Sequence, residues 1–372
     1  MKIAVVCHVR AGHVSAYHRL YVEHFRMAGC EVLDLGPPEP PGIFGRVLGQ
    51  LERFGWWRGR QTWRRAAQRI HAAEKASGGE PAKVFFSYLD SGFLEPKLAP
   101  SEVERWLPRG WAGVVNGPAA VKKAGQFSGK ERVLAAKYCR ALVVTDDSFV
   151  AACKTSWPGK PVVVMPELAD LSPPATTPEL VALRAWVGKR RLVGLLGVIS
   201  AKKNVAALLA CAGRALVERP DLAFVIAGDF SAKACSGPER RALGKKLAHL
   251  PANCRFYPEP ISEGPHFNGW VTACDYLWLA YRNVVYKSNM LTKAAHFRRA
   301  VLVSPGGVMA AHTVQYRLGE IVDPENSDQV MAAFEQLMKT PADIRAFDEF
   351  SALNSNAKLA ATVQSVLQAF QT

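Results

Sequence analysis

The sequence lacks the features that mark several common protein classes. Its eight cysteines form no CxxC pair and have no spacing typical of zinc ligands, so we expect reduced, buried thiols and no bound metal. No apolar run is long enough to cross a bilayer, and His8 and Arg10 interrupt the short apolar run at the start, which argues against a signal-peptide core. Neither a short-period repeat nor a low-complexity tract occurs. These absences predict a cytoplasmic protein whose contact with a membrane is at most peripheral.

The charge balance is unusual for an otherwise ordinary globular composition. The 372 residues carry 47 Lys and Arg against 32 Asp and Glu, a formal net charge of +15. Such an excess favours polyanionic partners, which include nucleic acid, anionic lipid headgroups and phosphorylated substrates. A chain of this length is also long for a single core, so we expect two domains.

Short apolar runs alternate with helical patterns along the whole chain. In the first half the predicted strands lie at 2–9, 31–36, 82–90, 111–117, 139–147 and 160–167, and in the second half at 191–200, 222–230, 254–260, 274–282, 300–305 and 319–324. Continuous apolar strands separated by helices indicate a parallel sheet covered on both faces. The fold class is therefore α/β, with two Rossmann-like doubly wound domains facing a cleft.

A change of composition marks the boundary between these halves. The Pro- and Thr-rich stretch at 169–189 is typical of a linker, which predicts one domain at 1–168 and a second at 190–354. The last segment, 355–372, has an apolar stripe at helical spacing, so we expect it to pack back on the first domain.

Four stretches in the second half resemble a family of enzymes. These are "VVVMPELADL", "LLGVISAKKNVAALLAC", "LAFVIAGDF" and "NMLTKAAHFRRAVLVSPGG" followed by "YRLGEIVDPEN". Their content and order are similar to the GT-B glycosyltransferases, and most similar to the retaining family-4 type. The resemblance implies a hexosyltransferase that takes a nucleotide-diphosphate sugar, needs no cofactor, and adds the sugar to a cell-envelope glycan or lipid-linked acceptor at the cytoplasmic membrane face.

The sequence also departs from that family. Val198 stands where the family has an Arg, and Val285 and Lys293 stand where it has two glutamates. An alternative is therefore a catalytically silent module that binds a nucleotide sugar or glycan. A nucleic-acid-binding protein is a third reading that the charge suggests, but no nucleic-acid module is recognisable.

The residues that could hold a donor diphosphate lie in two loops that enter helices. Ammonium groups beside helix N-terminal amides form an anion site, and the resemblance adds residues around the nucleotide. The candidate donor-binding residues are Gly12, Gly197, Lys202, Lys203, Asn204, Tyr257, Glu259, Lys287, Ser288, Asn289 and Lys293. The alternatives remain open: a solvated lysine pair at 202–203, plain helix capping at 288–289 with an exposed Lys293, and aromatic packing of Tyr257.

One histidine is a candidate catalytic residue. His13 follows Gly12 where the first strand gives way to a helix. In inverting relatives of this fold a histidine here acts as general base, because its pKa suits proton transfer near neutral pH. In retaining relatives the same loop contacts the donor phosphates, and a capping or surface histidine is equally compatible with the sequence.

The stretch "GWWRGRQTWRR" at 55–65 combines tryptophan with arginine. Such a mixture suits a bilayer interface, where the indole ring lies at headgroup depth and the guanidinium meets phosphate. The candidate contacts with an anionic membrane are Trp56, Trp57, Arg58, Arg60, Arg64 and Arg65. The alternative is that Trp63 and Ile70 are core residues and the arginines solvate the outer face of a helix.

Overall fold

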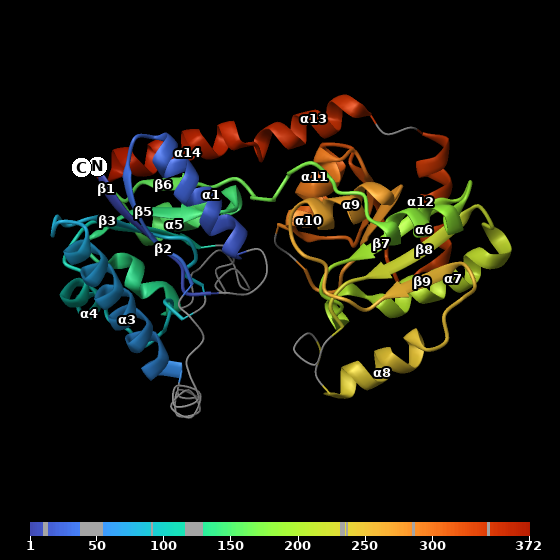
Figure 1. Cartoon of the computed structure of the whole chain (residues 1–372), viewed down its shortest axis with the longest axis horizontal. Helices are drawn as coiled ribbons and strands as arrows, with labels where there is room; N and C mark the ends of the chain where they lie inside the picture. The colour runs from blue at the N-terminus through green and yellow to red at the C-terminus, as the bar shows by residue number, and fades with distance from the viewer. Residues whose placement is uncertain are drawn as a thin grey trace. The chain divides into compact units, whose positions relative to one another are not determined.

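The computed structural model describes the chain except residues 10–13, 38–54, 91, 116–128, 231–234, 236, 285–286 and 341–342, and except the side chains of 55–58 and 130. The described chain divides into two compact units (Figure 1). Unit 1 consists of Met1–Pro166 and Ser355–Thr372, and unit 2 is Glu167–Asn354.

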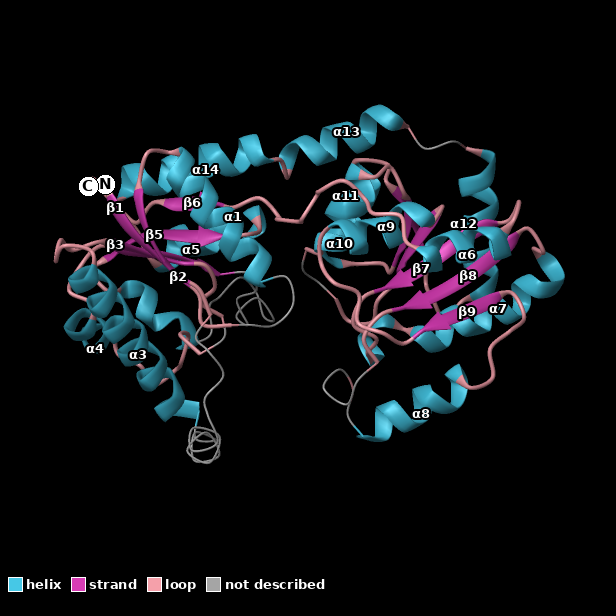
Figure 2. Ribbon diagram, viewed as in Figure 1, coloured by secondary structure: helices cyan, strands magenta, loops and turns pink. Residues whose placement is uncertain are grey.

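Unit 1 contains a parallel sheet whose described strands have the order β2-β1-β3-β4-β5-β6 (Figure 2). The strands are β1 Lys2–Val6, β2 Glu31–Leu35, β3 Lys83–Phe86, β4 Trp111–Val115, β5 Cys139–Val144 and β6 Val162–Val164. The described helices of this unit are α1 Val14–Met27, α3 Gly55–Ala76, α4 Pro100–Trp106, α5 Val150–Ser156 and α14 Asn356–Ala369, with 3-10 turns η2 Gly129–Ala135 and η3 Asp147–Phe149.

Both faces of this sheet are covered, as the apolar strands predict. Successive side chains of a strand point to opposite faces, and β3 shows the consequence. Phe85 packs its ring 5.2 Å from Tyr21 and 5.0 Å from Phe25, both on α1. Phe86 packs 5.0 Å from Trp63 on α3, so helices lie on both sides of the strand.

The helix α14 belongs to unit 1 although it follows unit 2 in the chain. It packs against α1, β5 and β6, and it buries one face that includes Leu359, Val363 and Val366. The hydroxyl of Thr362 also donates to the carbonyl of Val164 in β6. The apolar stripe that the sequence shows is thus the surface by which this helix is attached.

Unit 2 contains a second parallel sheet, and its described strands have the order β12-β11-β10-β7-β8-β9. The strands are β7 Arg191–Leu196, β8 Leu222–Ala227, β9 Cys254–Tyr257, β10 Tyr276–Leu279, β11 Ala300–Val303 and β12 Gly319–Ile321. The described helices are α6 Pro178–Val187, α7 Val205–Glu218, α8 Gly237–Leu247, α9 Pro265–Ala273, α10 Asn289–His296, α11 Gly307–Gln315, α12 Ser327–Lys339 and α13 Ile344–Leu353, with the 3-10 turn η4 Ala201–Lys203.

The stretch at 169–189 is not an irregular linker along its whole length. Its second half is the helix α6, which buries Leu180, Leu183 and Val187 in the core of unit 2. Thr177 caps this helix by accepting a hydrogen bond from the amide of Leu180, and Pro178 occupies the first helical position, where its missing amide costs nothing. Thr177 and Pro178, two of the residues that suggest a linker, are therefore start signals of a helix.

Candidate functional site

The strand order of unit 2 reverses between β7 and β10. The chain passes from β7 to β8 and β9 on one side, and β10, β11 and β12 then follow on the other side of β7. In open parallel sheets, ligands bind beyond the carboxyl ends of the strands at such a reversal. The loops that follow β7 and β10 are therefore the candidate site.

Lys203 joins these two loops. Its Nζ atom donates to the carbonyl of Leu196 at the end of β7 (2.7 Å) and lies 2.9 Å from the hydroxyl of Tyr281, just after β10. The ammonium group also lies 4.7 Å from the centroid of the Tyr281 ring. An ammonium group has three donors, and the contacts found among the described residues use two of them. A fixed, half-buried cation with one remaining donor therefore stands at the reversal point.

The loop residues next to Lys203 differ in their surroundings. Lys202 is exposed, whereas Asn204 is 2% exposed and has left-handed backbone (φ 55°) at the start of α7. Neither polar side-chain atom of Asn204 has a hydrogen-bond partner among the described residues. Buried polar groups normally form hydrogen bonds, so a ligand or water would supply the hydrogen-bond partners of this side-chain amide.

Glycine is required where the ends of β7 and β8 approach each other. Gly197 (φ 91°) follows β7, and Gly228 (φ 138°) follows β8. A Cβ atom on Gly228 would collide with the carbonyl group of Gly197. A Cβ atom on Gly197 would lie 3.7 Å from Nζ of Lys203 and 3.6 Å from the ring of Phe267. Because Gly197 has no side chain, no Cβ atom lies beside the ammonium group of Lys203 at this point.

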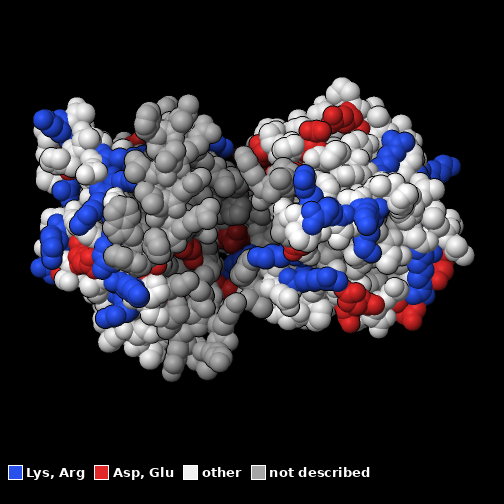
Figure 3. All heavy atoms as spheres, turned by 90° about the horizontal axis from the view of Figure 1, so that it is seen from below, with Lys and Arg blue, Asp and Glu red and all other residues white. Residues whose placement is uncertain are grey.

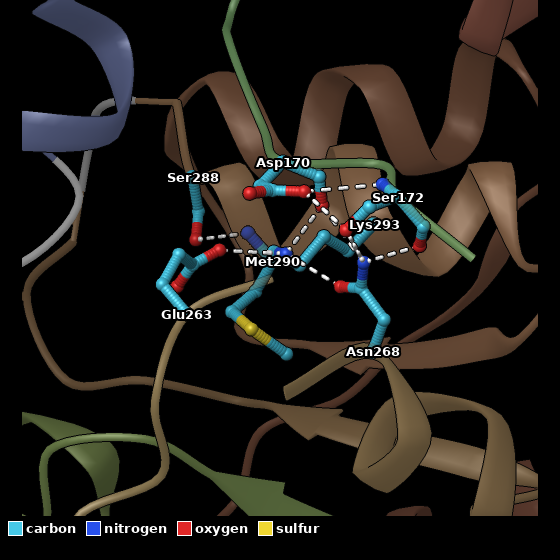
Figure 4. Close-up of polar contacts among 7 residues, drawn as sticks. All are labelled: Asp170, Ser172, Glu263, Asn268, Ser288, Met290 and Lys293. Atoms are coloured by element: carbon cyan, nitrogen blue, oxygen red, sulfur yellow. Dashed lines mark hydrogen bonds and ion pairs between the residues drawn. The ribbon is translucent and has the colours of Figure 1, made fainter. Parts of the chain in front are cut away.

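A buried cluster of polar groups also lies beside Phe267. Its centre is Lys293 on α10, whose side chain is 0% exposed. The Nζ atom lies 5.3 Å from the centroid of the Phe267 ring, donates to Oδ1 of Asn268 (2.6 Å) and to the carbonyl of Asp170 (2.7 Å), and forms an ion pair with Oε1 of Glu263 (2.6 Å). Figure 4 shows these three acceptors converging on the ammonium group.

The structure corrects the expectation for Lys293. The sequence suggests either a ligand contact or an exposed lysine, but the side chain is enclosed and all three of its donors have protein acceptors. Asn268, 0% exposed, extends the cluster by donating to the carbonyls of Asp170 (3.1 Å) and Ser172 (2.8 Å). Lys293 therefore anchors α10 to α9 and to the segment at 170–172, and it has no donor left for a phosphate.

The start of α10 agrees with the sequence. Ser288 is the N-cap residue, and its Oγ atom accepts a hydrogen bond from the amide of Met290 (3.3 Å). Lys287 and Asn289, on either side of Ser288, are half-buried. The predicted cap is confirmed, and a cationic side chain directly precedes the positive end of this helix.

Tyr257 and Glu259 are not brought to Lys203 by any contact among the described residues. The Tyr257 ring packs edge-on against Trp270, with 5.0 Å between the ring centroids, which is the aromatic packing that the sequence leaves open. Glu259 is exposed.

Several predicted residues lie wholly or partly outside the described structure. Gly12 and His13 fall in the segment at 10–13, and the side chains of Trp56, Trp57 and Arg58 are not described. Their predicted roles therefore stay predictions.

The described part of the tryptophan and arginine stretch is held within unit 1. Trp63 is 1% exposed, donates from Nε1 to the carbonyl of Phe93 (3.0 Å) and packs against aromatic rings. Ile70 is also 1% exposed, so the core alternative is correct for both residues.

The arginines of this stretch differ in their contacts. Arg60 forms two hydrogen bonds with the carboxylate of Glu102 (2.6 and 2.8 Å). The Arg64 guanidinium lies 5.2 Å from the centroid of the Trp106 ring. Arg65 is exposed.

Four site residues are missed by the sequence analysis: Tyr281, Phe267, Glu263 and Asn268. Tyr281 lies near the end of the strand predicted at 274–282, and the strand order, once known, would have pointed to that end as part of the site. The other three lie in or before α9, which carries no motif, and only the folded chain brings them to Lys293.

Solved structures with similar folds match the chain over its whole length. HepE of Anabaena in complex with UDP-glucose is 14% identical, with a TM-score of 0.66 over 99% of each chain. The trehalose-6-phosphate synthase OtsA is 10% identical (TM-score 0.68, 100% of this chain and 99% of that one), and a glycosyltransferase from Rickettsia africae ESF-5 is 11% identical (TM-score 0.62, 100% and 97%). No family model matches the sequence, and no curated protein is similar to it in sequence.

These identities are low, so the likeness establishes the fold. The chain has the GT-B architecture of two doubly wound α/β units, as its sequence predicts. Among the described helices, none is both long and apolar enough to span a membrane.

Proposed function

We propose that this protein is a glycosyltransferase that takes a sugar from a nucleotide-diphosphate sugar and transfers it to a cell-envelope glycan or lipid-linked acceptor at the cytoplasmic face of a membrane. The observation that carries the proposal is the position of Lys203 at the reversal point of the unit 2 sheet. The GT-B fold supports it, and so does the similarity to HepE, whose structure contains UDP-glucose.

The chemistry of the reaction explains why a fixed cation is needed there. When the sugar leaves, negative charge develops on the departing diphosphate, and donors that are already oriented stabilise that charge best. The carbonyl of Leu196 and the hydroxyl of Tyr281 hold the Lys203 ammonium in place, so its third donor can point at a phosphate oxygen without further ordering. Lys202 and the unsatisfied amide of Asn204 lie in the same loop and would add donors.

The start of α10 would supply the second half of the anion site. Ser288, Asn289 and the adjacent Lys287 lie where the helix dipole and the backbone amides favour negative charge. The buried ion pair of Lys293 with Glu263 would hold α10 in position. Internal contacts would then hold both halves of the site, the loop of Lys203 and the start of α10.

Two finer parts of the proposal rest on the sequence. His13 would act on the acceptor hydroxyl as general base if the enzyme inverts configuration, or contact the donor phosphates if it retains configuration, as the family-4 resemblance suggests. The stretch at 55–65 would contact an anionic membrane surface through Trp56, Trp57 and the arginines around them.

A silent binding module is the second candidate function. Val198, 51% exposed, stands where the resembling family has a cation, and Lys293 stands where it has a carboxylate. Such a module would bind the nucleotide sugar and leave it intact. Hydrolysis or transfer of the bound sugar separates the two functions.

The test is calorimetric titration with a panel of nucleoside diphosphates, followed by an assay for hydrolysis of the matching sugar nucleotide. Lys203→Met keeps the length of the side chain and removes the charge. A hydrogen bond to a charged group is worth about 1.5–3 kcal/mol, so the affinity for the preferred diphosphate should fall by roughly tenfold or more.

Lys189→Met is the matched control, because Lys189 is an exposed lysine of the same unit that has no ion pair in the described structure. Its affinity should equal that of the wild type. Unchanged affinity in a folded Lys203→Met protein would remove Lys203 from the site, and a wild type that binds no member of the panel would refute the proposed function.

A further inference from the structure

The helix α8 of unit 2 presents an unusually basic surface. Within Gly237–Leu247 it carries the cations Arg240, Arg241, Lys245 and Lys246, and Glu239 is its one acidic residue. All four cationic residues are exposed, whereas the buried residues of the helix are Leu243 and Leu247. Two leucines one turn apart therefore attach the helix, and the rest of its surface is open.

The arrangement around the helix axis separates the two kinds of residue. At 100° per residue, Lys245 lies opposite the midpoint of the two leucines and Arg241 lies close to Lys245. In Figure 1, α8 runs along the lower edge of unit 2, and Figure 3, drawn from below, shows Lys and Arg side chains gathered on that face. Arg241 and Lys245 thus form the outward side of α8, whereas Arg240 and Lys246, although exposed, lie closer to the leucines.

These cations have no partners in the described part of the chain. None of the four forms a side-chain hydrogen bond or an ion pair there. Several other basic residues of unit 2 do. The half-buried Arg214 pairs with Asp328 and Glu218, and the exposed residues Arg282, Arg298 and Lys339 pair with Glu325, Asp348 and Glu335. Exposed cations without an ion pair in the described structure also occur elsewhere in unit 2, such as Lys189 and Arg345, but α8 gathers four of them on one helix.

The positions of the charges also work against the helix itself. Arg241 and Lys245 are spaced i, i+4, where like charges repel each other. Lys245 and Lys246 lie in the last turn, where the helix dipole favours a cation, so the repulsion between Arg241 and Lys245 is the unfavourable effect. An anionic partner would relieve this repulsion.

We propose that α8 is an electrostatic docking surface for an anionic lipid bilayer. A bilayer presents many phosphate groups in one plane, so it can meet the outward Arg241 and Lys245 at once, with the exposed Arg240 and Lys246 beside them. Single-stranded nucleic acid would also need aromatic side chains for base stacking, and α8 has none. The stretch at 55–65 belongs to unit 1 and α8 to unit 2, so a contact through α8 is separate from the one proposed for that stretch and does not depend on the proposed transfer reaction.

The expected binding is reversible and sensitive to salt. No large apolar side chain is exposed on α8, so the contact would rest on charge alone. Each lysine or arginine near an anionic surface raises the affinity roughly fivefold. Salt screens such contacts over about 10 Å or less.

The experiment is co-sedimentation of the full chain with phosphatidylcholine vesicles, with and without phosphatidylserine, at low and high salt. Arg241→Gln/Lys245→Gln removes the two outermost cations of α8. Lys189→Gln/Arg345→Gln is the matched control, because it also removes two exposed cations of unit 2 that lack an ion pair in the described structure. All four positions are exposed, so both variants should keep the unfolding temperature of the wild type.

Binding should require phosphatidylserine, fall at high salt, and weaken by roughly tenfold or more in the α8 variant while the control stays within about twofold of the wild type. Equal losses in the two variants would show a general effect of net charge and overturn the proposal. A wild type that ignores phosphatidylserine vesicles, or that binds a labelled oligonucleotide in their place, would overturn it as well.

Discussion

Replacing Lys293 with methionine tests whether the buried cluster holds α10 in place. Methionine keeps most of the aliphatic stem and removes the ammonium group, so the change leaves a small cavity but deletes three hydrogen bonds. The Nζ contacts at 2.6, 2.6 and 2.7 Å are lost, and with them the donor to Oδ1 of the fully buried Asn268. The carboxylate of Glu263 then has no counter-ion.

The size of the effect follows from burial. Removing one partner of a buried ion pair typically costs about 3–5 kcal/mol, because the other charge is left uncompensated. The Glu263 side chain is 27% exposed and can recover some hydration, so the lower end applies. We expect a loss of about 3 kcal/mol, which lowers the unfolding temperature of a domain of this size by roughly 6–12 °C.

The assay is hydrogen exchange in increasing urea, read by mass spectrometry on peptides from α9 and α10, because it reports unit 2 by itself. The double variant Lys293→Met/Glu263→Gln should recover part of the loss, since it leaves no unpaired charge. Lys339→Met is the control: Lys339 pairs with Glu335 on the surface, with side-chain exposures of 68% and 56%, so stability should not change measurably. A Lys293→Met protein within about 1 kcal/mol of the wild type would refute the reasoning, as would a double variant whose loss equals the sum of the single losses.

Two further predictions concern unit 1. Trp63→Ala should destabilise this unit by about 3–5 kcal/mol in urea unfolding, because the ring is 1% exposed and packs against three aromatic rings; a loss below about 1 kcal/mol would contradict the core assignment. The hydrogen bond from Arg60 lowers the pKa of Glu102 below its ordinary value of 4.5, so the stability that this pair adds is present above that pH and is lost as the pH falls through the lowered pKa. The difference in stability between wild type and Glu102→Gln should therefore be constant near neutral pH and shrink in acid, and a difference that does not change between neutral and acid pH would show that the pKa is not lowered.

The sequence predicts the fold well because its strands are continuous apolar runs. β8, "LAFVIA", is buried at every residue. A short apolar run of this kind between helical patterns is typical of a strand in a parallel sheet that is covered on both faces. The helix α6 is misread because Pro and Thr occur both in linkers and at helix starts. The difference lies in the buried leucines that follow, whose partners are distant in the sequence.

The candidate site is predicted only in part, for a similar reason. Gly197, Lys203 and Ser288 stand at strand ends and helix starts, which local sequence reveals. The environment of Lys293 is set by residues 25 and 123 positions away in the chain, Asn268 and Asp170, so nothing near Lys293 distinguishes a buried lysine from an exposed one. Packing between distant segments encloses the Lys293 side chain and leaves Lys203 half-buried, and the local sequence of the two lysines does not reveal this difference.

The discontinuity of unit 1 has a consequence for how the protein is made. A ribosome synthesises all of unit 2 before it reaches α14, although the β5 and β6 surface that α14 covers was synthesised much earlier. During that interval the apolar positions beneath Leu359, Val363 and Val366 stay unprotected, while unit 2 already has every residue that its own sheet requires. Nascent chains stalled before residue 356 should therefore recruit chaperones through unit 1, and a ligand of unit 2 would not relieve that exposure.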